Sequence, residues 1–357
     1  MNQRRTLLTA LGALGAGSLT GGLAGSLTAS LAGALTASRP ARAQPAANNA
    51  DKVWRVGVLQ PGGAQAREVL HAQRELPKAL RAAGYVEGKN LVIDWRLADL
   101  NAERLKSQAE ELVRLKVDLI VTANTTATHA VQKATSTLPV VMAASGDPVG
   151  SGFAKSLAKP GGNITGLSNL SPELGTKMLQ MLLEITAAAR PKLTRVAVMI
   201  NPANSGHVLL LQNIQAAARI THSQILPLEV RNAADLATAF ATLTRERSEA
   251  LIIARDSAFG ELGSEIAERA LRLRLPTASG GTASATVGIL MSIGPKRPDQ
   301  FARVATYIDK IFKGTKPGDL PIEQPTLFEV IINGKTAKAL GLKIPQALLI
   351  SAERVIE

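Results

Sequence analysis

The residues of this chain with the clearest chemical potential are small polar residues that directly follow short apolar runs. Their hydroxyl, amide and backbone N–H groups can bind a carboxylate, and an aspartate among them can accept an ammonium group. We therefore predict a solute-binding crevice built from these loops. The candidate residues are Gln60, Asn124, Thr125, Thr126, Gly146, Asp147, Asn201, Asn204, Asp256 and Ser279.

Asn124, Thr125 and Thr126 follow the apolar run at residues 117–121, where a helix is expected to begin. Backbone N–H groups at a helix N-terminus favour an anion, so these residues could bind a carboxylate. The same residue types also act as ordinary N-caps. The sequence leaves both roles open.

Two aspartates are candidates for binding a cationic group. Asp147 follows the run at 138–142, and Asp256 follows the run at 250–254. The alternative role for Asp147 is to order a turn, and the alternative for Asp256 is to begin a helix. Asn201 and Asn204 follow a further run at 195–200, where Asn204 or Ser205 is expected to cap a helix.

Sequence signals for catalysis are missing. The four histidines show no metal-ligand spacing, and no nucleophile elbow, phosphate-binding loop or dinucleotide fingerprint is present. The chain contains no cysteine, which excludes disulfides and thiol chemistry. We expect a protein that is not an enzyme and that needs no cofactor or metal.

The candidate loops connect short strands and amphipathic helices that alternate along the chain. This alternation occurs twice, in two successive parts of the sequence. Such alternation predicts an α/β fold with two doubly wound parallel-sheet lobes. We expect a first lobe at 52–162 and 290–322, and a second lobe at 163–289 and 323–357. The chain returns between the lobes, which predicts a multi-strand hinge with the segment at 160–163 in its pivot.

Residues 1–43 differ from the rest of the chain. Arg4 and Arg5 precede an uncharged run rich in Ala, Gly, Leu, Ser and Thr, and a small-residue motif ends at Ala43. These features predict an export signal cleaved near Ala43, with a twin-arginine route suggested by the paired arginines. Without cysteine the protein cannot be a lipoprotein, so we expect it to be free in the periplasm.

The chain carries 41 basic and 28 acidic residues, a formal net charge of +13. Nucleic-acid binding is not expected, because the basic residues are scattered and aromatic residues make up only 3% of the chain, which leaves few stacking platforms. We expect the basic residues to form a solvated surface. We expect a monomer.

Several segments resemble those of ABC-transporter substrate-binding proteins of the tryptophan/tyrosine type, which have the type I periplasmic binding protein fold. The resemblance extends in order through nearly all of the chain after residue 43. The segments are GYVEGKNL at 84–91, ELVRLKVD at 111–118, GDPVG at 146–150, KPGGNITGLS at 159–168, NPAN at 201–204, LMS at 290–292, DLPIEQPT at 319–326 and KTAKALGL at 335–342.

The resemblance implies a receptor that closes two lobes on a small solute, such as an amino acid or a similar carboxylate, and delivers it to a membrane permease. It places Thr125 and Thr126 at the carboxylate and Asp256 at the ammonium group, with Asn201 and Asn204 facing the cleft.

One segment departs from the family pattern. Residues 277–287 are small and polar where relatives carry bulky and aromatic residues, and Phe259 is the single aromatic residue of the loop that begins at Arg255. We therefore expect a smaller or more polar ligand than an aromatic amino acid, with the loop around Ser279 setting specificity.

Two other functions remain open at this stage. A ligand sensor for a membrane signalling protein would use the same two lobes. An exported α/β hydrolase would need an acid such as Asp147 or Asp256 in catalysis, and it lacks the expected nucleophile motif.

Overall fold

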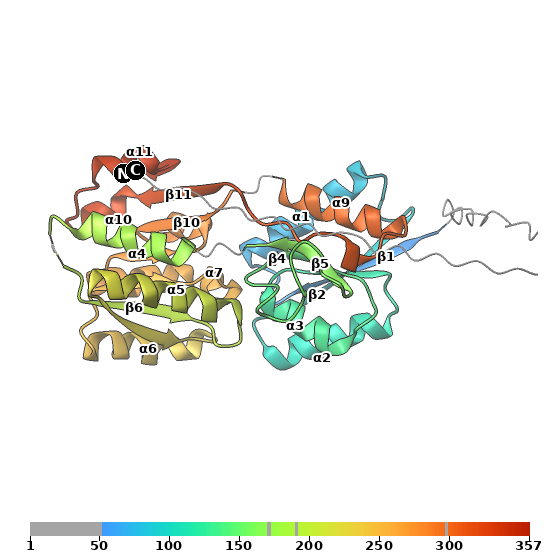
Figure 1. Ribbon diagram of the computed structural model, residues 1–357, viewed down its shortest axis with the longest axis horizontal. Helices are drawn as coiled ribbons and strands as arrows, with labels where there is room; N and C mark the ends of the chain where they lie inside the picture. Colours follow the sequence, from blue (N-terminus) through green and yellow to red (C-terminus); the bar gives the residue numbers. More distant parts are fainter. Residues whose placement is uncertain (1–51, 170–172, 190–191, 297–298) are drawn as a thin grey trace, which may run out of the picture. The chain divides into compact units, whose positions relative to one another are not determined.

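The structure, a computed structural model, describes residues 52–169, 173–189, 192–296 and 299–357. The predicted export signal at 1–43 lies outside these residues. The described chain forms two sheets, each covered by helices on both faces (Figure 1). The predicted fold class, two doubly wound α/β lobes, is confirmed.

The first sheet contains five parallel strands in the order β2-β1-β3-β4-β5. Helices α1 and α9 pack together on one face, and α2 and α3 pack together on the other. The elements are β1 (Trp54–Gln60), α1 (Arg67–Ala82), β2 (Leu91–Leu97), α2 (Ala102–Arg114), β3 (Leu119–Thr122), α3 (Thr125–Ala134), β4 (Val140–Ser145), β5 (Ile164–Ser168), α9 (Gln300–Phe312) and the short 3₁₀ helix η3 (Pro317–Asp319).

The second sheet contains seven strands in the order β12-β11-β10-β9-β8-β6-β7. All neighbours are parallel except the β10–β11 pair, which is antiparallel. The elements are α4 (Glu173–Thr186), β6 (Arg195–Ile200), α5 (Gly206–Thr221), β7 (Gln224–Glu229), α6 (Ala233–Arg245), β8 (Ala250–Ile253), α7 (Ser257–Glu261), α8 (Gly263–Arg272), β9 (Thr277–Ser279), the 3₁₀ helix η2 (Thr282–Val287), β10 (Met291–Pro295), β11 (Phe328–Asn333), α10 (Gly334–Ala339), α11 (Gln346–Ser351) and β12 (Arg354–Ile356).

Strand pairing corrects the expected lobe boundaries. Strand β5 pairs with β4 in the first sheet, and β10 pairs with β9 and β11 in the second sheet. Glu323 still bonds to the β5 backbone, because its N–H donates to Gly166 O at 3.0 Å. The crossings therefore lie after residues 168, 295 and 323, not at 162, 289 and 322. The segment at 160–163 precedes β5 within the first lobe, so it is not the pivot.

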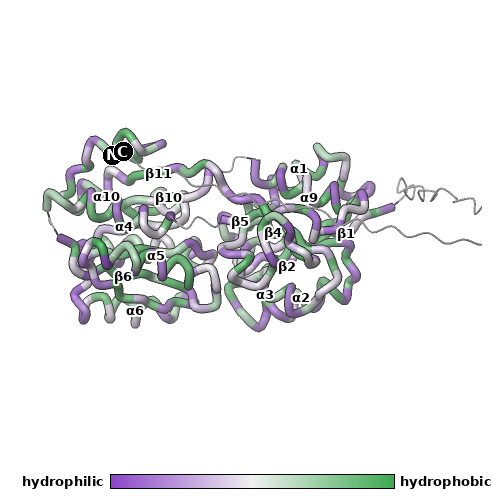
Figure 2. The backbone as a smooth tube through the Cα atoms, in the orientation of Figure 1, coloured by the Kyte–Doolittle hydropathy of each residue, from purple (hydrophilic) through white to green (hydrophobic). Residues whose placement is uncertain are grey.

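The strands are buried on both faces, as continuous apolar runs require. In β1, Val56 and Val58 pack under α1 and α9, whereas Leu59 packs with residues of α2 and α3. The hydropathy colouring shows hydrophobic segments along the interior strands β4 and β6 (Figure 2). Within the described part of the chain, no helix combines the length and the apolarity needed to cross a membrane.

Candidate functional site

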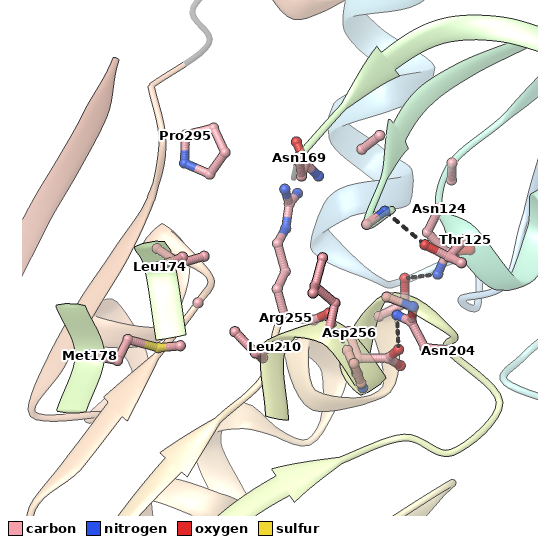
Figure 3. A pocket seen from close by; sticks show the side chains of 18 of the residues that line it. Asn124, Thr125, Asn169, Leu174, Met178, Asn204, Leu210, Arg255, Asp256 and Pro295 are labelled. Atoms are coloured by element: carbon pink, nitrogen blue, oxygen red, sulfur yellow. Dashed lines mark hydrogen bonds between the residues drawn. The ribbon is translucent and has the colours of Figure 1, made fainter. Parts of the chain in front are cut away.

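A pocket of about 100 Å³ is lined by residues from both lobes (Figure 3). Its walls come mostly from loops that follow strands and from the first turns of the next helices. In the first lobe these loops follow β3, β4 and β5, and in the second lobe they follow β6 and β8. The carboxyl ends of parallel strands are where open α/β sheets bind ligands, and this rule led to the sequence prediction.

Asn124 and Thr125 line the first-lobe side of the pocket, where α3 begins. The Asn124 side chain caps α3, because its Oδ1 accepts from Ala127 N at 2.9 Å and from Thr126 Oγ1 at 2.9 Å. Thr125 Oγ1 accepts from Gly146 N at 2.9 Å. The hydrogen bonds show that Asn124 caps α3. The carboxylate role of Thr125 and Thr126 stays a prediction.

Asp256 lines the second-lobe side and is 9% exposed. Its carboxylate accepts from Asn201 Nδ2 at 3.2 Å, from Asn204 Nδ2 at 3.0 Å and from Ala258 N at 3.1 Å. The residue therefore caps α7 and also holds two amides that follow β6. Three donors share the two carboxylate oxygens, and the ammonium role of Asp256 stays a prediction.

His207, buried in the first turn of α5, connects the same two loops. Asn201 N donates to its Nδ1 at 2.9 Å, and its Nε2 lies 3.0 Å from Arg255 O. A carbonyl oxygen only accepts, so Nε2 carries the proton and the ring is neutral. Burial lowers the pKa of His207, with the nearby Asp256 opposing this effect.

We expect the free energy of unfolding to fall as the pH drops below about 6.5, the ordinary histidine pKa, because His207 takes up a proton more readily in the unfolded chain. The slope from this one group approaches about 1.4 kcal/mol per pH unit until its folded-state pKa is reached. The His207→Gln variant should lose this part of the pH dependence in urea unfolding at pH 5.5 and 7.5.

The comparison with wild type is needed because burial also lowers the pKa of His129, which acts in the same direction. His71→Gln, at an exposed position of α1, is the control. An His207→Gln variant with the full wild-type pH dependence would contradict the assignment.

Leu174, Met178 and Leu210 form an apolar wall of the pocket, and Pro295 lies nearby (Figure 3). The leucines and the methionine come from α4 and α5, which pack against each other in the second lobe. The pocket thus offers one polar side and one apolar side to a solute.

Side chains of the two lobes also bond directly. Ser205 Oγ lies 2.6 Å from Ser151 Oγ and 3.1 Å from His129 Nε2. Asn124 Nδ2 donates to Ser257 Oγ at 3.1 Å. Ser205 makes no capping bond for α5, whereas Asn204 Oδ1 accepts from Gly206 N at 3.2 Å, so of the two expected caps only Asn204 bonds to the helix backbone.

A second cavity of about 410 Å³ shares part of this lining. It is bordered by β9 and η2, which form the small, polar segment that the sequence singled out. Ser279, Thr282 and Ser284 are among its lining residues. Their small side chains leave this space open. The contribution of this segment to specificity stays a prediction.

The structure brings together half of the ten predicted residues. Asn124, Thr125, Gly146, Asn204 and Asp256 line the first pocket, and Ser279 lines the larger cavity. The remaining four have other positions: Gln60 lines a separate cavity of about 90 Å³, Thr126 bonds to Asn124, Asn201 bonds to Asp256, and Asp147 Oδ1 accepts from Gly150 N at 2.8 Å in a turn.

Six polar residues of the lining are absent from the predicted set: Glu68, Asn169, His207, Asn213, Arg255 and Ser257. Asn169 is the first residue after β5, and Arg255 is the second residue after β8. The rule used for the other candidates, a polar residue after a buried strand, would have found both. Among the residues that the structure describes, no group of three or more His, Asp or Glu side chains is arranged to hold a metal ion.

Comparisons with known proteins agree with this architecture. Residues 56–356 match the family model for ABC transporter substrate binding proteins. The chain is 25% identical over 272 residues to a tyrosine-binding protein of Clostridioides difficile, covering 76% of this chain and 77% of that protein.

Two solved structures share the fold. A conserved domain protein from Vibrio cholerae is 28% identical, with a TM-score of 0.77 over 85% of this chain and 100% of its own. A Streptococcus pneumoniae domain solved in complex with L-Trp is 24% identical, with a TM-score of 0.77 over 85% of this chain and 99% of its own. The family match spans both lobes, and the chain therefore belongs to the family of ABC transporter substrate-binding proteins.

Proposed function

We propose that this protein is an exported, periplasmic receptor that binds a small amino acid or similar carboxylate between its lobes and hands it to a membrane permease. The observation that carries this proposal is the pocket lined by both lobes, with polar groups on one side and an aliphatic wall on the other. Such a pocket suits a solute with a charged head and an apolar body.

The names of two relatives support the solute class. One is a tyrosine-binding protein, and the other was solved with L-Trp. The lining of the first pocket in this chain contains leucine, methionine and proline but no Phe, Tyr or Trp among the described residues. This composition favours an aliphatic or more polar amino acid over an aromatic one that needs ring stacking.

Export and cellular location rest on the predicted signal at 1–43, and action as a monomer is also part of the proposal. Amino-terminal sequencing of the secreted protein checks the signal directly, since a start at Gln44 is expected. A mature protein that retains Met1 would contradict it.

The binding function is tested by thermal unfolding of the purified chain with the twenty protein L-amino acids. At a ligand concentration 100 times the Kd, binding contributes about 2.7 kcal/mol, which should raise the melting temperature by about 5 °C or more. Native mass spectrometry of protein purified without denaturation should show the same solute if it is retained. No shift with any amino acid would overturn the amino-acid part of the proposed solute class.

A further inference from the structure

The Arg255 side chain lies at the junction of three cavities, including the pocket between the lobes and the larger cavity beside it. Ala254 and Asp256 on either side are buried, and Arg255 itself is half-buried. In Figure 3 its side chain extends from the end of the second-lobe strand into the pocket, toward Asn169. The guanidinium is thus directed at the space that a solute would occupy.

The charge of Arg255 has no side-chain partner within the described part of the chain. Several other arginines are paired with a carboxylate: Arg55 with Asp94 at 2.6 Å, Arg96 with Glu111 at 2.8 Å and Arg269 with Glu265 at 2.7 Å. A guanidinium that is partly removed from water and left unpaired is costly unless an anion binds to it. Its planar set of donors matches a carboxylate in particular.

Asn169 contributes a second unpaired polar group from the first lobe. Its backbone N–H donates to Ser145 O at 2.6 Å, which fixes the residue at the end of β5. No hydrogen bond of its side-chain amide is formed with the described residues, and Figure 3 shows this amide beside the tip of Arg255. Two donor-bearing side chains, one from each lobe, therefore face the same point of the pocket.

We propose that Arg255 and Asn169 together bind the carboxylate of the solute, and that this contact draws the two lobes together. The inference rests on the proposed function and names the group that the site recognises. It assigns the anion-binding role to a charged guanidinium rather than to Thr126, whose hydroxyl donates to Asn124, or Thr125, whose hydroxyl is neutral. Glu68 lines the same three cavities and supplies an exposed carboxylate for an ammonium group.

The test uses isothermal titration of the full mature protein with the twenty L-amino acids, their carboxamides and the deaminated acids of the apolar ones. An acid that binds wild type should bind at least 10-fold more tightly than its carboxamide. Arg255→Met should weaken the acid by about 10- to 150-fold, the range for a hydrogen bond to a charged group, and leave the carboxamide unchanged.

Three further variants sharpen the readout. Arg255→Lys keeps the charge but loses the planar donor pair, so an intermediate loss is expected. Asn169→Asp places a carboxylate beside Arg255 and should repel the acid more strongly than Asn169→Ala does. Arg219→Met, at an exposed position on α5, is the matched control and should bind like wild type.

The outcomes separate the two proposals. Equal affinity for an acid and its carboxamide would overturn the anion anchor and leave the receptor function standing. So would an affinity of Arg255→Met within 2-fold of wild type, provided that urea unfolding shows this variant to be folded. Binding of deaminated acids without amino acids keeps the anchor and overturns the amino-acid class. No binding by any compound of the panel overturns both.

Discussion

Replacing Gly206 with valine should weaken solute binding by about 10- to 100-fold while leaving each lobe folded. A Cβ atom at Gly206 would lie 2.9 Å from Gly146 Cα and 3.3 Å from Asp147 N, both backbone atoms of the other lobe. Backbone atoms held by β4 cannot move aside as a flexible side chain can, so the lobes must separate. Overpacking of this kind costs about 1–3 kcal/mol, and that cost falls on the conformation that binds.

The reciprocal substitution provides a second measurement of the same contact. Gly146→Ala would bring a Cβ to 3.1 Å from Gly206 Cα, so it should also reduce affinity, and less than the valine does. Gly162→Ala is the matched control, because its Cβ meets no atom within 4 Å. Titration calorimetry measures affinity, and urea unfolding verifies the fold. A Gly206→Val protein with wild-type affinity would show that binding does not need this close approach.

Replacing Asp256 with alanine should lower the free energy of unfolding by about 3 kcal/mol, the largest loss of stability that we expect from a single change at the site. The alanine removes the acceptor of Asn201, Asn204 and the Ala258 N–H together. These donors are then left unsatisfied in a buried region, where each costs about 1–3 kcal/mol. The loops after β6 and β8 also lose the link that holds them in register.

The Asn232→Ala variant measures the cost of losing a helix cap alone, without the bonds that Asp256 makes to Asn201 and Asn204. Asn232 Oδ1 accepts from Ala234 N at 2.9 Å at the start of α6, so it makes the same kind of cap at an exposed position without buried partners. Its replacement should cost about 1 kcal/mol, as exposed caps do. Equal losses in the two variants, measured by urea unfolding, would show that the two asparagine amides contribute nothing.

Solute titration of the folded Asp256→Ala fraction tests the other role predicted for this residue. If Asp256 binds an ammonium group of the solute, the affinity of the folded variant should fall by more than the lost folding stability accounts for. If affinity is unchanged, the ammonium role is removed and the residue is structural.

The fold class was predictable because its signal is local. Buried parallel strands read as short apolar runs such as residues 117–121 and 195–200, and polar residues such as Asn101 and Asn124 mark where helices begin. The candidate site was half predictable for the same reason, since loops after strands meet at one edge of a sheet. Arg255 and Asn169 satisfy that rule, but they lie outside the predicted set, which holds helix-capping residues and acids.

The sequence by itself determined the two α/β lobes, the loops that form the pocket and the family to which the chain belongs. Only the tertiary structure decided which sheet each hinge strand joins, because β5 and β10 have apolar patterns that would suit either sheet and only backbone pairing distinguishes them. It also decided which polar side chains are already satisfied. Thr125, Thr126 and Asp256 have hydrogen-bond partners from neighbouring or distant segments. The side chains of Arg255 and Asn169 have none in the described part of the chain. The folded arrangement decides which groups become partners, and residue type and spacing do not contain that information.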